Sequence, residues 1–106
     1  LLTVKNLKFA NEYIDFYTKK NLTKNISFLK KKKSIVLKED FFNHSREVIF
    51  RSFTEVIKIV GKKYYPARGK KIDKILSEIN NKASFKVTLG GCIIKKVNQT
   101  IILSKE

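Results

Sequence analysis

The fold is decided by the stretch FKVTLGGCIIKKVNQTIIL, residues 85–103. Apolar and polar residues alternate over 85–89, which is the two-residue period of a half-buried strand. The glycine pair at 90–91 can adopt the positive φ angles of a two-residue hairpin turn, and the NQ pair at 98–99 is a candidate for a second such turn. We therefore expect three consecutive antiparallel strands.

Two-residue turns at both places determine which side chains share a face of this sheet. The predicted core face carries Phe85, Val87, Leu89, Cys92, Ile94, Ile101 and Leu103. The opposite face carries Lys86, Thr88, Ile93, Lys95, Val97, Thr100 and Ile102. In this register Lys86 lies directly opposite Lys95, and like charges that face each other across a strand pair are destabilising. Either the two ammonium groups splay into water, or an anion compensates them.

Upstream of this sheet, apolar residues recur at helical spacing in two segments. Residues 46–60 and 70–80 are predicted helices, with Asn43 or Ser45 as the N-cap of the first. Gly61 is expected to end the first helix as a left-handed cap. Farther upstream, two short strands, Ile26–Leu29 and Ser34–Leu37, are predicted on either side of four consecutive lysines, Lys30, Lys31, Lys32 and Lys33. The lysine run is interpreted as the solvated tip of a hairpin, and the alternative is that its four positive charges reach a phosphate backbone.

The first helix is predicted over about residues 2–21, and it has apolar residues on two sides. One set is Val4, Leu7, Ala10, Ile14 and Tyr17, and the second is Leu2, Phe9, Tyr13 and Phe16. This arc is wider than one small domain needs to bury. We expect part of it to pack on a part of the protein outside this sequence, or on a second copy in a homodimer.

The predicted fold class is therefore α+β. A connector helix, residues 1–24, precedes an accessory domain, residues 25–106, in which two central helices pack on a small antiparallel sheet. The length of 106 residues suits one domain. Because the sequence contains no methionine, even at position 1, we expect it to be a piece of a longer protein.

The charge balance points to a polyanionic partner. The chain has 24 Lys and Arg residues against 9 Asp and Glu residues, which gives a net charge of +15. Such a surplus costs self-repulsion in a compact domain, and nucleic-acid-binding proteins commonly carry it. No apolar run approaches the roughly 18 residues of a membrane span, and no secretory signal is visible.

The strongest local signal for nucleic-acid binding is the basic linker, residues 62–71. Its cations are Lys62, Lys63, Arg68, Lys70 and Lys71, and they surround Tyr64 and Tyr65. Basic groups pair with phosphates, and aromatic rings stack on unpaired bases. The alternative is that the tyrosines pin the linker to the core.

The sequence predicts no catalytic or metal site. It has no phosphate-binding glycine loop, because Gly90 and Gly91 join two strands rather than a strand and a helix. One histidine, His44, and one cysteine, Cys92, cannot form a typical zinc set. A lone cysteine on a core strand is interpreted as inert packing, and a single cysteine suits a reducing compartment.

The order of these elements resembles a known family. A helix containing Ile49-Phe50-Arg51 ends at Gly61, a basic linker with Pro66 and Arg68 follows, and an LGG hairpin at 89–91 leads to Lys95-Lys96. This order is similar to the region after the catalytic domain of bacterial tRNA(Ile)-lysidine synthetases, formerly grouped as MesJ-type proteins. The resemblance covers about residues 26–106, and residues 1–21 resemble the connecting helix.

The resemblance implies a role in tRNA modification. In that family a separate catalytic domain uses ATP with magnesium to adenylate the wobble cytidine of a CAU-anticodon tRNA(Ile), and lysine then displaces AMP to give lysidine. This chain lacks the SGGxDS loop of that domain, so no catalytic residue carries over and no cofactor is expected here. What remains resembles a cytoplasmic accessory domain that holds tRNA and contacts the catalytic domain. Family positions that tend to be basic match Arg51, Arg68, Lys95 and Lys96.

Other functions remain open from the sequence alone. One is a different RNA- or DNA-binding module, although no recognition helix of the helix-turn-helix type is visible. Another is a structural interaction domain whose charge serves solubility. Docking on anionic lipid is a third, although the basic residues are not confined to one amphipathic helix. The residues predicted to contact nucleic acid are Arg51, Lys62, Lys63, Arg68, Lys70, Lys71, Lys86, Lys95 and Lys96.

Overall fold

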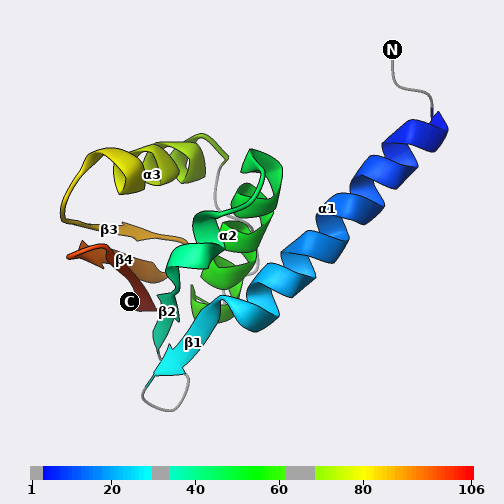
Figure 1. Cartoon of the computed structure of the whole chain (residues 1–106). Helices are drawn as coiled ribbons and strands as arrows, with labels where there is room; N and C mark the ends of the chain where they lie inside the picture. The colour runs from blue at the N-terminus through cyan, green and yellow to red at the C-terminus, as the bar shows by residue number, and fades with distance from the viewer. Residues whose placement is uncertain (1–3, 30–33, 62–68) are drawn as a thin grey trace.

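A five-stranded antiparallel sheet with helices on one face forms the body of the chain in the computed structural model (Figure 1). The structure describes residues 4–29, 34–61 and 69–106, with the backbone alone for 4–9. The spatial order of the strands is β1 (Ile26–Leu29), β2 (Ser34–Leu37), β5 (Thr100–Lys105), β4 (Cys92–Val97) and β3 (Phe85–Leu89). The α+β prediction is confirmed.

Both predicted hairpin turns are present. Gly90 and Gly91 have φ angles of 61° and 82°, and Asn98 and Gln99 have φ angles of 50° and 68°. Positive φ at both central residues matches the right-handed twist of the flanking strands. The resulting register is the predicted one, and it places Lys86 opposite Lys95.

The predicted helices are also present, with small changes at their ends. They are α1 (Val4–Lys24), α2 (Arg46–Gly61) and α3 (Gly69–Asn81), and a short 3-10 helix, η1 (Glu39–Phe42), precedes α2. Ser45 caps α2, because its Oγ accepts a hydrogen bond from the Val48 backbone N–H at 3.4 Å. The helix α1 continues one turn beyond the predicted end near residue 21.

The core lies between the sheet and the two helices α2 and α3. The sheet contributes buried apolar residues at alternate positions of β2, β4 and β5, which are Ile35, Leu37, Cys92, Ile94, Ile101 and Leu103. The helices contribute Phe53, Val56, Ile57, Val60, Ile72, Ile75 and Ile79, and η1 adds Phe41. One face of the sheet is therefore covered by helices.

The expectation for Gly61 is wrong in its mechanism. Among the described glycines, positive φ occurs at Gly90 and Gly91, and Gly61 is the buried last residue of α2. A Cβ at Gly61 would collide with the backbone carbonyl of Gly90 and lie 3.2 Å from Cys92 Sγ. Glycine is required here because the end of α2 touches the β3–β4 turn, and not because residue 61 needs a left-handed backbone conformation.

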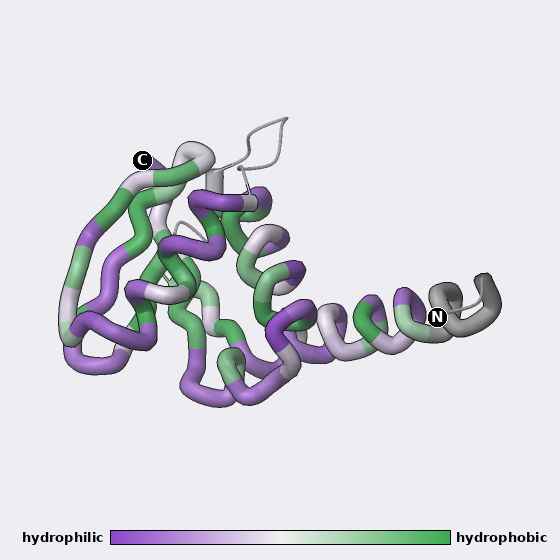
Figure 2. Tube along the Cα trace, turned by 90° about the horizontal axis from the view of Figure 1, so that it is seen from above, coloured by the Kyte–Doolittle hydropathy of each residue, from purple (hydrophilic) through white to green (hydrophobic). Residues whose placement is uncertain are grey.

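The packing of α1 changes along the part of the helix whose side chains the structure describes, residues 10–24. Figures 1 and 2 show the helix extending away from the sheet, and Figure 2 shows hydrophobic and hydrophilic segments alternating along it. Of the first predicted apolar set, Ala10 is exposed, and Ile14 and Tyr17 are half-buried. Tyr13 and Phe16, on the second predicted face, are 56% and 58% exposed. Leu2 lies outside the described residues, as does the side chain of Phe9.

Near its C-terminal end α1 is anchored by a buried asparagine that the sequence did not predict. Asn21 is fully buried, and its side-chain amide donates to the Phe41 carbonyl and to Ser52 Oγ, both at 3.1 Å. Its side-chain oxygen accepts a hydrogen bond from the Asn25 side chain at 2.8 Å. This network connects α1 to η1 and α2. The proposed division of the chain at residue 24 stays a prediction.

Candidate nucleic-acid interface

The face of the sheet opposite α2 and α3 contains two rows of residues that cross all five strands, and the Val97–Thr100 pair lies beyond them. We call these ten residues the open sheet face. The first row is Ser27, Val36, Ile102, Lys95 and Lys86. The second row is Leu29, Ser34, Ser104, Ile93 and Thr88. Apolar and hydroxyl side chains occupy the middle, and the two lysines lie together on β3 and β4.

Lys86 and Lys95 are the two charged residues among the ten of the open sheet face. Residues that flank a two-residue turn form a hydrogen-bonded pair, and the pair type alternates from there. Counting from Leu89 and Cys92 puts Lys86 and Lys95 at a non-hydrogen-bonded position, where Cα atoms are about 4.5 Å apart. Both side chains are exposed, and among the described residues no carboxylate forms an ion pair with either. An anion that bridges the two ammonium groups would relieve their repulsion.

The sheet as a whole carries basic side chains and no acidic one. The five strands contain four lysines and neither Asp nor Glu. Eight of the nine acidic residues lie on α1, η1, α2 and α3, and the ninth is Glu106. This segregation follows from the sequence and the topology together. It leaves the five strands without a carboxylate side chain, and Glu106, which donates its backbone N–H to the Gly91 carbonyl, is the acidic residue next to the C-terminal end of β5.

Lys96 lies on the other face of the sheet from Lys86 and Lys95. Its side chain is half-buried, and its ammonium group donates to the carbonyl of Ile79 in the last turn of α3. A cation at this position satisfies a terminal carbonyl and interacts favourably with the helix dipole. Through this hydrogen bond, Lys96 links β4 to the C-terminal end of α3.

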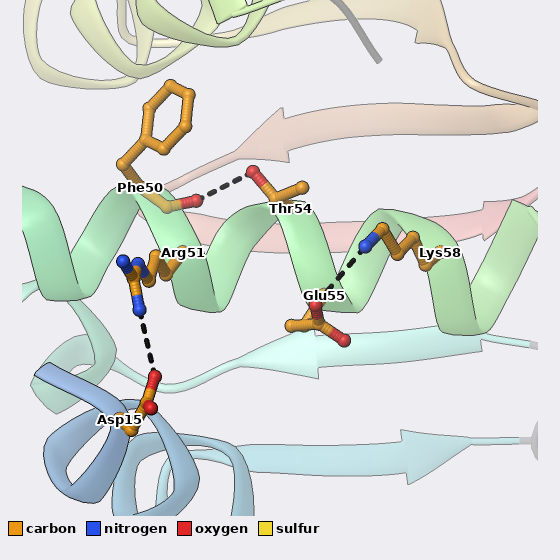
Figure 3. A network of polar contacts seen from close by, with 6 residues as sticks. All are labelled: Asp15, Phe50, Arg51, Thr54, Glu55 and Lys58. Atoms are coloured by element: carbon orange, nitrogen blue, oxygen red, sulfur yellow. Dashed lines mark hydrogen bonds and ion pairs between the residues drawn. The ribbon is translucent and has the colours of Figure 1, made fainter. Parts of the chain in front are cut away.

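Arg51 also has a partner inside the chain. It lies on α2, and its guanidinium Nη1 is 2.8 Å from Asp15 Oδ1 on α1 (Figure 3). On the same helix Lys58 pairs with Glu55 at 3.4 Å, and Thr54 donates to the Phe50 carbonyl at 2.8 Å (Figure 3). Both side chains of the Arg51–Asp15 pair are solvent-exposed, so the pair links α1 to α2 with only a small gain in stability.

A cavity of about 480 Å³ lies between α1 and α2 beside this ion pair. Its lining combines Asp15 and Glu55 with Lys19 and Arg51, next to apolar side chains. Thr18 also lines it, and the buried Thr18 hydroxyl has no hydrogen-bond partner among the described residues. Charges of both signs balance in this cavity, so it does not select a phosphate.

The remaining predicted contacts belong to the linker. Lys70 and Lys71 are exposed in the first turn of α3, in the helical layer and not on the open sheet face. Lys62, Lys63 and Arg68 lie outside the described residues, as do both linker tyrosines and the Lys30–Lys33 run. The structure thus brings together Lys86 and Lys95, and it places Lys96, Arg51 and the Lys70–Lys71 pair elsewhere.

The structure adds a ring cluster that was not among the predicted binding residues. Tyr13, Phe16 and Tyr17 on α1 lie beside His44, which follows η1. The three-residue and four-residue spacing along α1 was a usable signal, because it places all three rings on one side of a helix. The position of His44 could not be inferred from the sequence, since it depends on how η1 meets α1.

Cys92 has the surroundings of a structural residue. Burial raises the pKa of its thiol from 9.0 to about 11, and its Sγ donates to the Ile57 carbonyl at 3.2 Å. A protonated, buried thiol is a poor nucleophile. Among the described residues, no three His, Cys, Asp or Glu side chains are grouped so that they could hold a metal ion.

No family model, no characterised protein and no solved structure matches this chain. The resemblance to lysidine synthetases therefore stays a prediction that rests on the order of its motifs. In the part of the chain that the structure describes, no helix is long and apolar enough to cross a membrane.

Proposed function

We propose that this chain is an RNA-binding accessory domain that contacts the phosphate backbone of tRNA with its open sheet face. One observation carries the proposal: Lys86 lies directly opposite Lys95 on a sheet that contains no acidic residue. An arrangement of two unpaired cations costs stability in the free domain. A bound phosphate compensates that cost, and the hydroxyl of Thr88, two residues from Lys86 on the same face of β3, is placed to donate to its oxygens.

The chemistry of this face favours contacts with the backbone over contacts with bases. Its ten residues include no aromatic ring on which a base could stack, and no arginine, asparagine or glutamine that could read a base edge. We expect binding through this face to be insensitive to sequence and strongly dependent on salt.

The substrate and the parent protein are proposed from the resemblance. The chain would serve a cytoplasmic lysidine synthetase, in which a separate domain binds ATP with magnesium and performs the chemistry. In that setting tRNA and the catalytic domain are the two partners, and this chain positions the former without catalysing a reaction.

The test is a titration of the purified chain with fluorescently labelled tRNA between 50 and 200 mM salt. Neutralising about 4–8 phosphates predicts that affinity falls by roughly 10²- to 10⁴-fold over that range. The double substitution Lys86→Gln and Lys95→Gln should weaken binding and flatten the salt slope by up to about two counterions. Lys58→Gln with Lys82→Gln is the matched control, because it removes the same charge from lysines that pair with carboxylates. Equal losses in both double variants would refute a role for the open sheet face.

The linker makes a separate contribution in this proposal. Replacing Arg68, Lys70 and Lys71 by Gln should weaken tRNA binding and flatten the salt slope by up to about one counterion for each phosphate that the variant no longer neutralises. Replacing the lysines at 30–33 is the control, since that run is interpreted as a hairpin tip. If the tip variant loses affinity while the linker variant keeps it, the linker is not part of the RNA-binding surface.

A second candidate is supported by the apolar centre of the same face. Val36, Ile93 and Ile102 are half-buried and are not covered by α2 or α3. A partner protein, such as the catalytic domain of the parent, could pack on them. Val36→Ser with Ile102→Ser separates the two candidates, because it should disrupt a protein contact and leave the salt slope of tRNA binding unchanged.

A further inference from the structure

The ring cluster of Tyr13, Phe16, Tyr17 and His44 has close internal geometry. The ring centroids of Tyr13 and Tyr17 are 4.6 Å apart, and those of Phe16 and Tyr17 are 5.1 Å apart with an edge-on angle of 86°. The His44 ring lies 6.3 Å from Tyr17. These separations are those of favourable aromatic pairs, so the rings support one another on the outside of the molecule.

The cluster is not part of the core. Tyr13 and Phe16 remain more than half exposed, whereas Phe41 and Phe53 are fully buried. Exposed apolar side chains that lie together mark interaction sites more often than single exposed ones do. Their exposure leaves at least the Tyr13 ring accessible to a flat ligand.

Beside the rings, a shallow hollow of about 720 Å³ opens between α1 and the turn that joins η1 to α2. Tyr13 and Tyr17 form its aromatic side, and Asn43, His44 and Ser45 line it with polar groups. The Asn43 amide nitrogen donates to Asp40 Oδ1 at 3.2 Å, so its own oxygen is left to accept a hydrogen bond. An aromatic wall with a few polar groups is a common construction of small-ligand sites.

Charges of both signs lie around the cluster, since Asp40 accepts the Asn43 amide beside the hollow, and the preference for an anionic occupant comes from the net charge of +15. The Lys20 ammonium lies 5.6 Å from the centre of the Phe16 ring, and Arg46 begins α2 directly after Ser45. A second copy of this chain would bring a further charge of +15 to the same surface, which opposes association. A ligand with a flat apolar body and a negative backbone satisfies both the rings and the cations.

We propose that this hollow binds an unpaired nucleotide of an RNA, with the base stacked on Tyr13. The inference rests on the proposed RNA-binding function and adds a site at which unpaired bases are preferred over duplex. Base stacking on aromatic side chains is the common means by which proteins hold single-stranded RNA. The open sheet face has no aromatic ring, so in this proposal it contacts phosphates while the ring cluster holds an unpaired base.

The test compares two labelled probes, an eight-nucleotide oligouridine and a twelve-base-pair RNA duplex, with the same chain. Tyr13→Leu keeps an apolar side chain and removes the stacking surface. We expect it to weaken oligouridine binding by about 5- to 150-fold and duplex binding by less than about 2-fold. Tyr13→Phe keeps the ring and should bind both probes as the parent does. Ile59→Ala, at an exposed apolar position on α2, is the control and should change neither affinity.

The outcomes separate this inference from the proposed function. If the parent binds neither probe, the RNA-binding function itself is refuted. If the duplex binds through Lys86 and Lys95 but Tyr13→Leu leaves oligouridine affinity unchanged, the nucleotide site alone is refuted. If sedimentation shows a dimer that Tyr13→Ser converts to a monomer, the cluster is an interface between copies, and the nucleotide site is again overturned.

Discussion

Gly61→Ala is expected to destabilise the chain, although alanine is the better helix former. The residue ends α2, and the added methyl group would collide with the carbonyl of Gly90 in the β3–β4 turn. That carbonyl cannot move freely, because Gly90 and Gly91 both have positive φ in a two-residue turn. Cys92 Sγ lies 3.2 Å from the same methyl position, so the methyl group cannot avoid the carbonyl by moving toward Cys92.

Two opposing effects determine how much Gly61→Ala changes the free energy of unfolding. Overpacking a well-packed core costs about 1–3 kcal/mol, and a clash with backbone rather than with a flexible side chain belongs at the upper end. Replacing glycine by alanine in a helix gains up to about 1 kcal/mol. The net expectation is a loss of about 2 kcal/mol, which lowers the Tm of a domain of this size by roughly 8–16 °C.

Gly69→Ala is the matched control for this experiment. Gly69 is exposed in the first turn of α3, and a Cβ there would lie 3.6 Å from Phe50 Cζ, an ordinary contact. The same substitution should therefore leave the stability unchanged or raise it by up to about 1 kcal/mol. Thermal unfolding followed by circular dichroism measures both variants. A Gly61→Ala variant whose Tm stays within about 2 °C of the parent would refute the close approach of α2 to the turn.

Three other predictions concern single residues. Lys86→Gln should leave the unfolding free energy unchanged or raise it by about 0.2–1 kcal/mol at low salt, and this gain should vanish near 1 M salt. The tRNA affinity of the same variant should fall. A loss of stability would contradict the argument that Lys86 and Lys95 repel each other. Asn21→Ala should cost about 2–4 kcal/mol in urea unfolding, because it removes a fully buried side chain and leaves its buried partners unsatisfied; a cost below about 1 kcal/mol would mean that water replaces it. For Cys92, the folded-state pKa of about 11 lies above the unfolded value, so its stabilising contribution is complete below about pH 9 and is lost as the pH rises through 11. Unfolding curves at pH 8 and pH 11 should show a loss in the parent that exceeds the loss in Cys92→Val by about 2 kcal/mol, and equal losses would refute it.

The elements of the fold were predictable because local chemistry and tertiary structure agree. Gly90-Gly91 and Asn98-Gln99 accept positive φ, which sets the turns, and the turns set the strand register, including the pairing of Lys86 with Lys95. The helices α2 and α3 each have one apolar side, which left little choice about the face that meets the sheet.

The features that escaped prediction are those that depend on a distant partner. Asn21 is polar and was not counted in the core, yet its hydrogen bonds to Phe41 and Ser52 make it fully buried. Lys96 was predicted to contact nucleic acid, and its hydrogen bond to the Ile79 carbonyl at the end of α3 was not foreseen. Arg51 was predicted to contact nucleic acid, which stays a prediction, and its ion pair with Asp15 at 2.8 Å was not foreseen. In each case the partner lies more than fifteen residues away along the chain, so local pattern carries no signal for it.

The strand order has a consequence for the way the chain is synthesised. The central strand of the sheet, β5, is the last of the five to leave the ribosome. Until it emerges, the β1–β2 hairpin and the β3–β4 hairpin have no strand to join them, since β5 pairs with β2 on one side and β4 on the other. A nascent chain that ends at residue 99 therefore presents two apolar half-sheets with open edges, which are targets for aggregation or for a chaperone. The two hairpins become one continuous sheet only when β5 has emerged and pairs with β2 and β4.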